Sequence, residues 1–404
     1  GFESVNRDVR SVIDINATVK AKLVMFGHYP TKFSDQLLKS YPFDYILRGD
    51  PEFTFSELLT ALQNKGDIST IKGLSYKKAD GSVHVNPPRD DIKDLDLLPF
   101  PDFSQLNLTN YFSGFRDKSP FTTMITSRGC SFRCTYCVRS YGDTWRQRSV
   151  DNVILEIEQL VKNQHIKALR ILDDTFTLNR NWVLEFCKKL ADKKFNLEWS
   201  CLSRPETITE DMMIAMNKAG CNRIMIGIES GSDKILQAYK RFYTIDEKIK
   251  QVFTNLRKHG IESFTWFIVG APYETEEDVR KSIEAAKYLD SDWVALNMMR
   301  AYPGTEDFDK LMAKGEVEFQ LTPYRSEFKT AVMSEEKIRD MLFEFYRSFY
   351  FRPSWLIRKL PVFLAHPVFA FSLASEYIKW ELQRTNMTNK SNELAEAKKI
   401  AATE

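Results

Sequence analysis

The sequence lacks an excess of charge of either sign. Its 404 residues include 57 lysines and arginines against 55 aspartates and glutamates, a formal net charge of +2. Proteins that bind nucleic acid usually carry a strongly basic surface or stripe, so no nucleic-acid partner is expected. Hydrophobic residues make up 43% of the chain and charged residues 28%, values typical of a folded protein of about two to four domains.

Long apolar runs are also missing. No uninterrupted stretch of about 18 apolar residues occurs, because the longest candidate, residues 355–373, is broken by Arg358, Lys359, His366 and two prolines. The first residues show no secretory pattern of basic and then apolar residues. We therefore expect a cytoplasmic protein without a membrane-spanning helix. The chain starts with glycine, so residue 1 is not taken as a native start.

Cysteine is scarce and unevenly placed. The six cysteines are Cys130, Cys134, Cys137, Cys187, Cys201 and Cys221. The first three lie close together and the others are isolated, which is typical of a ligand cluster and not of a disulfide framework. Structural zinc needs four ligands, usually from two cysteine pairs or from a pair with two histidines. No second pair exists and the five histidines are dispersed, so zinc is disfavoured.

Regular alternation of short apolar strands and helix signals fills residues 121–310. Strands are expected near residues 122–126, 167–172, 197–201, 223–228, 263–269 and 292–297. Ser149, Thr209 and Thr275 are expected to cap the helices that follow them, and Thr244 and Glu247 are expected to form a capping box. Six strand–helix units in a row predict an α/β fold with a parallel sheet curled into a partial (β/α)6 barrel, which is open on one side.

Other patterns flank this barrel, which we expect to span residues 119–310. Residues 1–66 resemble the C-terminal half of a doubly wound domain, with a capping box at Thr54–Glu57 opening its last helix. Residues 67–118 form a connector that contains a hairpin around Asp80–Gly81. Residues 311–404 form a helical, aromatic-rich region followed by a polar tail that is expected to fray.

The cysteine cluster directly follows the first barrel strand. Its spacing in Cys130, Cys134 and Cys137 is C-x3-C-x2-C, and the end of a barrel strand is where such barrels place their chemistry. Thiolates at this spacing can bind three corners of one iron–sulfur cubane and leave its fourth iron without a protein ligand. An open iron can hold a substrate or a cofactor.

With Tyr136 before its last cysteine, this loop resembles the signature of the radical S-adenosylmethionine (radical SAM) enzymes. Polar motifs follow the later strands. Their sequences and their order resemble those of the class that contains the methylthiotransferases and the cobalamin-dependent radical SAM proteins. They occupy residues 172–176, 203–205, 227–232, 268–275 and 302–305. The resemblance covers residues 120–310. It implies a [4Fe-4S] cluster on the three cysteines, with S-adenosylmethionine chelated by the open iron and cleaved reductively to a 5′-deoxyadenosyl radical.

The resemblance also implies cofactor-binding residues at these motifs, while no catalytic side chain is assigned beyond the cluster. Asp173 and Asp174 would contact the methionine ammonium group, although a helix cap or a rim ion pair is an alternative for each. Arg204 would bind the methionine carboxylate, with a rim salt bridge as its alternative. The remaining candidates are Tyr136, Ser200, the ribose-side residues Glu229 and Ser230, and the adenine-side residues Gly270 and Pro272. Tyr273 stands where relatives commonly carry glycine.

The front of the chain resembles the end of a cobalamin-binding domain, on the string Asp44–Thr54 and the turn at residues 27–31. The loop that supplies an axial histidine in many members is absent, and His28 belongs to a different turn. The resemblance implies cobalamin as a further cofactor and methyl transfer to an unactivated carbon, with a flavodoxin- or ferredoxin-type electron donor and a small-molecule substrate. Alternatives are a cyclase or rearrangement enzyme, a methylthiotransferase and a non-catalytic metal-bearing scaffold.

A stripe of apolar and aromatic residues marks the C-terminal region between Trp355 and Phe371. Such a stripe most often packs across the open edge of a barrel, and we favour that interpretation. The alternative is that it lies on a membrane surface and admits a lipid-like substrate, since Arg358 and Lys359 stand within it.

Overall fold

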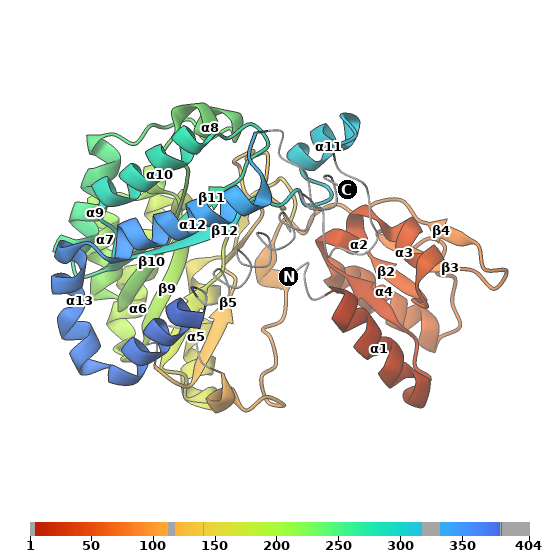
Figure 1. Ribbon diagram of the computed structural model, residues 1–404. Coiled ribbons are helices and arrows are strands. Elements are labelled where there is room, and N and C mark those ends of the chain that lie inside the picture. Colours follow the sequence, from red (N-terminus) through yellow and green to blue (C-terminus); the bar gives the residue numbers. More distant parts are fainter. Residues whose placement is uncertain (1–4, 112–117, 140, 317–331, 380, 382–404) are drawn as a thin grey trace, which may run out of the picture. The chain divides into compact units, whose positions relative to one another are not determined.

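The computed structural model describes residues 5–111, 118–139, 141–316, 332–379 and 381 (Figure 1). The chain forms two compact units, Gly1–Arg347 and Ser348–Glu404. The four-part division expected from the sequence stays a prediction, and the expected polar tail lies outside the described residues.

A six-stranded parallel sheet forms the centre of the first unit. Its strands are β5 (Phe121–Met124), β8 (Ala168–Ile171), β9 (Glu198–Ser203), β10 (Cys221–Glu229), β11 (Glu262–Val269) and β12 (Trp293–Met298). They pair in parallel in the order β12-β11-β10-β9-β8-β5, so β5 and β12 are the edges of an open sheet. The predicted strands and the partial (β/α)6 barrel are confirmed.

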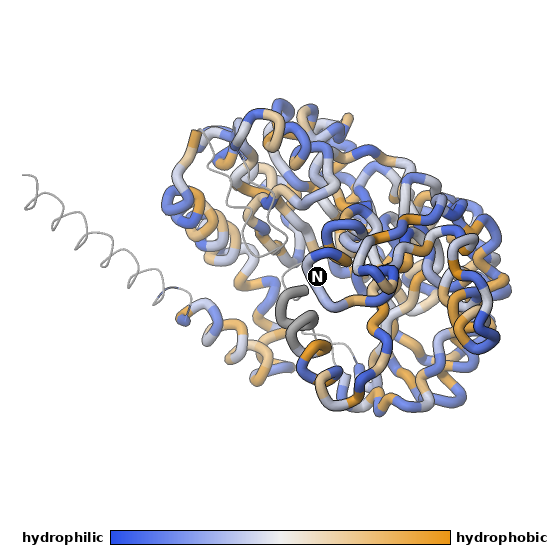
Figure 2. The backbone as a smooth tube through the Cα atoms, turned by 90° about the vertical axis from the view of Figure 1, so that its right-hand side faces the viewer, coloured by the Kyte–Doolittle hydropathy of each residue, from blue (hydrophilic) through white to orange (hydrophobic). Residues whose placement is uncertain are grey.

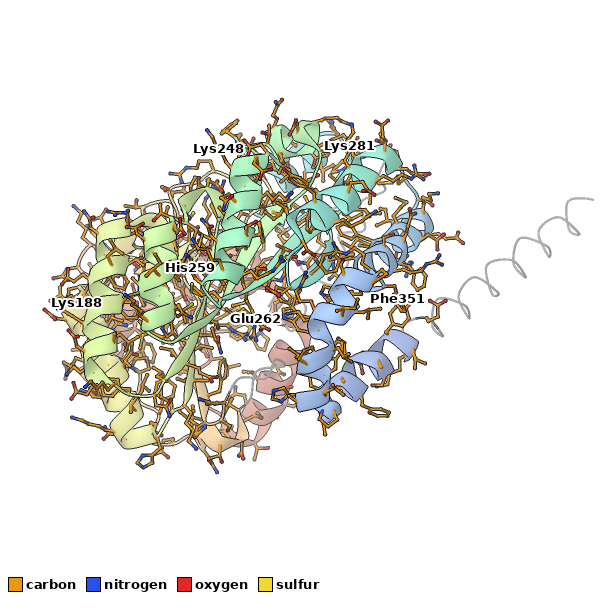
Figure 3. All side chains as sticks on the ribbon, turned by 90° about the vertical axis from the view of Figure 1, so that its left-hand side faces the viewer. Lys188, Lys248, His259, Glu262, Lys281 and Phe351 are labelled. Carbon is orange, nitrogen blue, oxygen red and sulfur yellow. The ribbon has the colours of Figure 1, made fainter. Side chains whose placement is uncertain are left out.

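Helices cover the outer face of this sheet (Figures 1 and 3). They are α5 (Val150–Gln164), α6 (Arg180–Lys193), α7 (Glu210–Lys218), α8 (Asp233–Ala238), α9 (Glu247–Lys258) and α10 (Glu276–Leu289). A further helix, α11 (Glu306–Ala313), follows the last strand and does not cover the sheet. The apolar faces of the covering helices are buried, while Lys188 on α6, Lys248 on α9 and Lys281 on α10 point outward in Figure 3. The burial of one face of each helix agrees with the helical periodicity of apolar residues in the sequence.

The predicted helix caps were partly correct. Ser149 accepts the Asn152 N–H, and Thr275 forms a reciprocal box with Asp278. Thr209 occupies the expected cap position without a capping bond from its side chain. The box predicted for Thr244 and Glu247 is wrong, because Asp246 caps α9 instead and accepts the Ile249 N–H at 3.0 Å.

The front of the first unit is a four-stranded sheet. Its strands are β1 (Val24–Phe26), β2 (Tyr45–Leu47), β3 (Leu74–Lys77) and β4 (Val83–Val85), and its helices are α1 (Val5–Val19), α2 (His28–Lys32), α3 (Ser34–Ser40) and α4 (Pro51–Gln63). β1 and β2 are parallel, and the predicted hairpin of β3 and β4 continues the sheet antiparallel to β2. The turn expected at residues 27–31 is instead formed by the N-cap Gly27 and helix α2. The box predicted at Thr54–Glu57 is also wrong, since α4 already begins at Pro51 and buried Thr54 donates to the Lys72 carbonyl.

Short elements complete the first unit. β6 (Ser127–Arg128) and β7 (Arg146–Gln147) form a small antiparallel ladder, and the 3-10 turns are η2 (Leu95–Leu97), η3 (Leu108–Asn110), η4 (Phe176–Leu178) and η5 (Pro205–Thr207). The ladder lies at the two ends of the cysteine-bearing loop, so it closes this loop at its base.

The helical C-terminal region begins with α12 (Glu335–Tyr350), followed by α13 (Pro353–Ala365) and helical residues 367–379. The first part of α12 packs against the barrel edge. Phe345 lies 5.1 Å from Phe267 between ring centroids, and the Leu296 N–H donates to the Tyr346 hydroxyl at 2.9 Å. Among the described residues, the structure contains no helix with both the length and the apolar character needed to cross a membrane.

Candidate active site

The cysteine loop is fixed at its start by Asp173. This residue follows β8, and its buried carboxylate accepts hydrogen bonds from the Thr126 N–H at 2.6 Å, the Thr126 hydroxyl at 2.5 Å and the Ser127 hydroxyl at 2.6 Å. Burial raises the pKa of Asp173, while these donors oppose the rise. Asp173 therefore acts behind the loop as a positioning residue, and its partners occupy the oxygen atoms that would otherwise meet a ligand.

Gly129, the residue before the first cysteine, allows a close approach of two backbone segments. Its φ is +77°, and a Cβ atom placed on it would lie 2.2 Å from the Thr144 carbonyl oxygen. A side chain at this position would force the base of the loop apart. The small ladder of β6 and β7 and this glycine together set where Cys130 emerges.

The three cysteines line one cavity of about 530 Å³ at the carboxyl ends of the barrel strands. Burial raises the pKa of the Cys137 thiol to about 12, with further contributions from the neighbouring Cys134 and Asp174, and burial also raises the pKa of Cys130. In the described part of the chain, no three His, Cys, Asp or Glu side chains are arranged to bind a single metal ion. The three thiols around a cavity, without a fourth cysteine beside them, are a donor set that fits a multi-iron cluster with one open iron.

Asp174 differs sharply from its neighbour Asp173. It lines the cavity, and no partner for its carboxylate is found among the residues that the structure describes. Partial burial and then the charge of Asp173 raise the pKa of Asp174. An unpaired carboxylate facing a cavity is the group that a ligand ammonium would meet.

Arg204 reaches the cavity from the end of β9. Its guanidinium lies 3.6 Å from the Phe132 ring centroid, its Nη1 donates to Cys134 Sγ at 3.2 Å, and its Nε donates to Glu206 at 2.7 Å. The ion pair with Glu206 is the rim salt bridge that the sequence left open as an alternative. The same buried guanidinium lines the cavity, so it can meet a ligand carboxylate there.

Glu229 is directed into the cavity by a distortion at the end of β10. The pairing register with β11 shifts between Gly227 and Glu229, and Glu229 has a φ of +68°. A non-glycine residue in this conformation is strained and is held by its surroundings. A Cβ atom on Gly227 would lie 2.3 Å from Glu229 Oε1, so glycine leaves the space that this carboxylate fills.

Arg241 joins Glu229 to Tyr136. Its Nη1 lies 3.4 Å from Glu229 Oε1 and 3.2 Å from the Tyr136 hydroxyl, and its Nη2 donates to the Gly227 carbonyl. Burial raises the pKa of Glu229, and the charge of Arg241 opposes this rise. Sequence reasoning missed Arg241, which stands in a loop after α8 without any motif around it. Its position at the same end of the barrel as the polar strand ends was the only available signal.

The other predicted residues do not line the cavity. Ser200 lies within β9 and accepts from Arg170 Nε at 3.4 Å, whereas Ser203, at the end of the strand, lines the cavity instead. Ser230 is buried 3.2 Å from the Ser282 hydroxyl and ties the loop after β10 to α10. Gly270 and Pro272 belong to the turn after β11 and are absent from the cavity wall among the described residues.

The turn at residues 270–275 is formed with Tyr273 at the position where the family resemblance implied a glycine. The Glu274 carboxylate accepts the Gly270 and Ala271 N–H groups, and the Glu274 N–H donates to the Ala271 carbonyl. Burial raises the pKa of Glu274 to about 7. The Tyr273 side chain packs beside Tyr239 and Ala271, and Lys234 donates to the Tyr273 carbonyl.

Charged side chains connect the cysteine loop to the front sheet. Asp50 Oδ1 lies 3.0 Å from Arg128 Nη1, its Oδ2 accepts from Arg146 and from the Ile92 N–H, and Glu52 pairs with Arg128 at 2.6 Å. A smaller cavity of about 280 Å³ lies beside this cluster. It is lined by His28, Thr31, Lys32, Gly49, Asp50, Asp91, Cys137, Arg139, Tyr141, Gly142, Asp143 and Gly304.

Sequence comparisons connect this geometry to known proteins. The family profile of the radical SAM superfamily matches residues 124–286. An uncharacterised methyltransferase of Pyrococcus horikoshii is 34% identical over 84% of this chain and 74% of its own length. The anaerobic magnesium-protoporphyrin IX monomethyl ester cyclase of Rubrivivax gelatinosus is 28% identical over 82% of this chain, which spans only 61% of that relative.

Solved structures share the fold. TsrM from Kitasatospora setae, a radical SAM methyltransferase solved with cobalamin and a [4Fe-4S] cluster, aligns with a TM-score of 0.65 at 20% identity over 79% of this chain and 63% of that chain. OxsB, a cobalamin-dependent radical SAM enzyme solved with aqua-cobalamin and S-adenosylmethionine, gives a TM-score of 0.69 at 16% identity over 95% of this chain and 62% of that chain. The chain belongs to the radical SAM superfamily of enzymes, whose cofactors are a [4Fe-4S] cluster and S-adenosylmethionine.

Proposed function

We propose that this protein is a cobalamin-dependent radical SAM methyltransferase acting on an unactivated carbon of a small molecule. Cys130, Cys134 and Cys137 would hold the [4Fe-4S] cluster. Bound together, the reduced cluster and S-adenosylmethionine supply a 5′-deoxyadenosyl radical that can take a hydrogen atom from carbon. The proposal requires a one-electron donor of the flavodoxin or ferredoxin type.

The observation that carries the proposal is the set of groups around the 530 Å³ cavity. Three thiols, the carboxylate of Asp174, which has no partner within the described ranges, and the guanidinium of Arg204 face the same space. An amino acid end group carries one ammonium and one carboxylate, and these two side chains have the complementary charges. Glu229 adds acceptor oxygens suited to a pair of hydroxyl groups, and Arg241 holds it in place.

Support for cobalamin comes from the front of the chain. The front sheet has the parallel β1–β2 pair expected for half of a doubly wound domain, and the smaller cavity beside it reaches Cys137. Cobalamin would serve as the methyl carrier in such a reaction. We assign no axial ligand, and His28 is not given that role. Burial, and then the positive charge of Lys32, lower the pKa of His28.

A cyclase reaction is the second candidate, because a cyclase-named relative aligns over 82% of the chain. Metal analysis separates these enzymes from a metal-bearing scaffold. About four irons and four sulfides per chain are expected for the enzyme, and one zinc is expected for the scaffold.

The test uses anaerobically reconstituted protein with dithionite, hydroxocobalamin and S-adenosylmethionine carrying a deuterated methyl group. We expect 5′-deoxyadenosine, and transfer of the labelled methyl group to cobalt with release of S-adenosylhomocysteine. Cys134→Ala should reduce 5′-deoxyadenosine to background, because it removes one cluster ligand. Cys187→Ala is the matched control, since Cys187 is buried on α6 outside the loop.

The two levels of the proposal fail separately. Equal 5′-deoxyadenosine from the wild type and Cys134→Ala would refute the cluster assignment. Normal 5′-deoxyadenosine without any cobalamin-dependent S-adenosylhomocysteine would refute methyl transfer and favour the cyclase candidate.

A further inference from the structure

The helix α13 in the second unit presents its apolar residues to solvent. Ile357 is 72% exposed and Leu364 is 73% exposed, and Leu356 and Leu360 on the same face are exposed as well. These positions recur at the three- and four-residue spacing of one helix face. The packing predicted for the stripe from Trp355 to Phe371 stays a prediction, and the structure leaves this face exposed.

The opposite face of α13 is already packed within its own unit. Trp355 is buried, with its ring centroid 4.8 Å from Tyr350 and 5.9 Å from Phe363. Lys359 is buried on the same side. A helix that turns a lysine inward and leucines outward is inverted relative to an ordinary surface helix. Packing inside this unit therefore does not cover the leucines that face outward.

The apolar surface continues into the next helical segment. Val368 is 82% exposed and Phe371 is 76% exposed. Phe351, labelled in Figure 3, contacts Tyr377 with ring centroids 5.3 Å apart, so the segment at 367–379 folds back to the start of α13. Figure 2 shows orange, hydrophobic positions recurring along the last coloured helical stretch before the grey trace. We call the exposed set Leu356, Ile357, Leu360, Leu364, Val368 and Phe371 the outer apolar face.

The charge of this part of the chain has one sign. From residue 348 to residue 375, within the second unit, the sequence contains no aspartate or glutamate, whereas it contains Arg352, Arg358 and Lys359. In the whole chain the two signs are almost balanced, so this stretch is distinct. Basic residues beside an apolar helix face are the combination that binds anionic lipid surfaces.

We propose that the outer apolar face docks the protein onto the surface of an anionic lipid bilayer. The 13 residues of α13 would extend about 20 Å, shorter than the roughly 30 Å hydrocarbon core, so the helix would lie in the interface and not cross it. Docking buries the outward leucines and places the half-buried Arg352 and Arg358 near lipid phosphates, while Lys359 stays in the interior of the unit. This inference does not depend on the proposed function, because it rests only on the second unit and its charge.

The experiment is sedimentation of the full chain with vesicles of phosphatidylglycerol and phosphatidylcholine, and separately with pure phosphatidylcholine vesicles, at low and high salt. The wild type should bind the anionic vesicles and lose much of this binding at high salt. A triple variant, Ile357→Gln, Leu360→Gln and Leu364→Gln, should bind the anionic vesicles with an affinity at least roughly tenfold lower, because it removes three apolar contacts. These residues are exposed, so the fold should persist, which circular dichroism checks.

The matched control replaces three exposed leucines on helices of the first unit, Leu59→Gln, Leu62→Gln and Leu155→Gln. It should bind vesicles like the wild type. Equal binding of the two triple variants would overturn the proposal, and so would absence of wild-type binding to anionic vesicles. Dimers that the α13 variant abolishes, without vesicle binding by the wild type, would identify the face as a contact between copies and would also overturn it.

Discussion

Two groups of charged side chains lie on either side of the cysteine loop, and they differ in how completely they are paired. On the front side, the Asp50 carboxylate is almost fully buried and accepts from Arg128, Arg146 and the Ile92 N–H. On the cavity side, Asp174 has no partner for its carboxylate among the described residues, and Arg204 turns part of its guanidinium toward the cavity.

The difference indicates separate tasks for the two groups. A buried charge without compensation is costly, so a completely paired cluster stabilises the contact between segments and is expensive to break. A carboxylate left unpaired at a cavity contributes nothing to folding and is available to a ligand. Substitutions should therefore affect stability on the front side and ligand binding on the cavity side.

The largest effect is expected for Asp50→Asn. This change leaves Arg146, which is itself buried, without its charged partner and weakens the pairing of Arg128. Breaking a buried pair in this way costs about 3–5 kcal/mol in the free energy of unfolding. Urea unfolding of the apo protein measures it.

Asp35→Asn is the control for that measurement. Asp35 forms an exposed pair with Lys39 on α3, and exposed pairs of this kind contribute about 0.3–0.5 kcal/mol. Equal, small losses in both variants would mean that the Asp50 cluster does not stabilise the contact, and the comparison between the two groups would fail.

Glu274 is an intermediate case and gives a prediction in pH. Its carboxylate accepts two backbone N–H groups through one oxygen, while its other oxygen has no partner among the described residues. Burial raises the pKa of Glu274 to about 7 from its ordinary value of 4.5. The native state therefore holds more protons than the unfolded state between these two pH values, and its stability falls as pH rises through them.

Glu274→Gln should remove this dependence. Between pH 5 and pH 8, the free energy of unfolding of the wild type should fall by about 2.5 kcal/mol relative to that of the variant, at about 1.4 kcal/mol per pKa unit. Denaturant unfolding across this range measures it. A difference that stays constant with pH would show that Glu274 ionises in the native state with an ordinary pKa.

The sequence predicted the barrel well because its signals are local. Strands buried on both faces and helices with one apolar face leave periodic patterns, and these patterns located all six barrel strands. Helix starts were harder, since neighbouring residues compete for the cap. Asp246 caps α9 although Thr244 also fits the pattern. Pro51 after Asp50 is itself a helix-start signal, which the box at Thr54 obscured.

The site was predicted in composition but not in detail. The three cysteines line the cavity as expected from one short motif. The sequence could not tell Asp173 from Asp174, because both have the same chemistry and only the fold decides which one meets Thr126. Ser200 and Ser203 differ by their position along β9, and Arg241 comes from a loop whose path depends on packing far along the chain.

The smallest change in stability is expected for Asp174→Asn, and it sharpens the comparison most. Because partial burial and Asp173 raise the pKa of Asp174 in the folded protein, the charged carboxylate is not favoured there, and its removal should leave the unfolding free energy unchanged or slightly higher. Affinity for S-adenosylmethionine, measured by anaerobic equilibrium dialysis of the reconstituted protein, should fall about 10- to 100-fold, as expected for a lost hydrogen bond to a charged group.

Asp173→Asn is the matched control, one residue away and chemically identical. Its carboxylate accepts three hydrogen bonds that hold the start of the cysteine loop, and an amide with a single acceptor oxygen cannot replace them all. The main effect of this variant should be a lower free energy of unfolding, and its affinity for S-adenosylmethionine should change less. If both variants lost stability equally and bound S-adenosylmethionine equally, the two carboxylates would share one role, and pairing would not separate structural from ligand-binding charges in this protein.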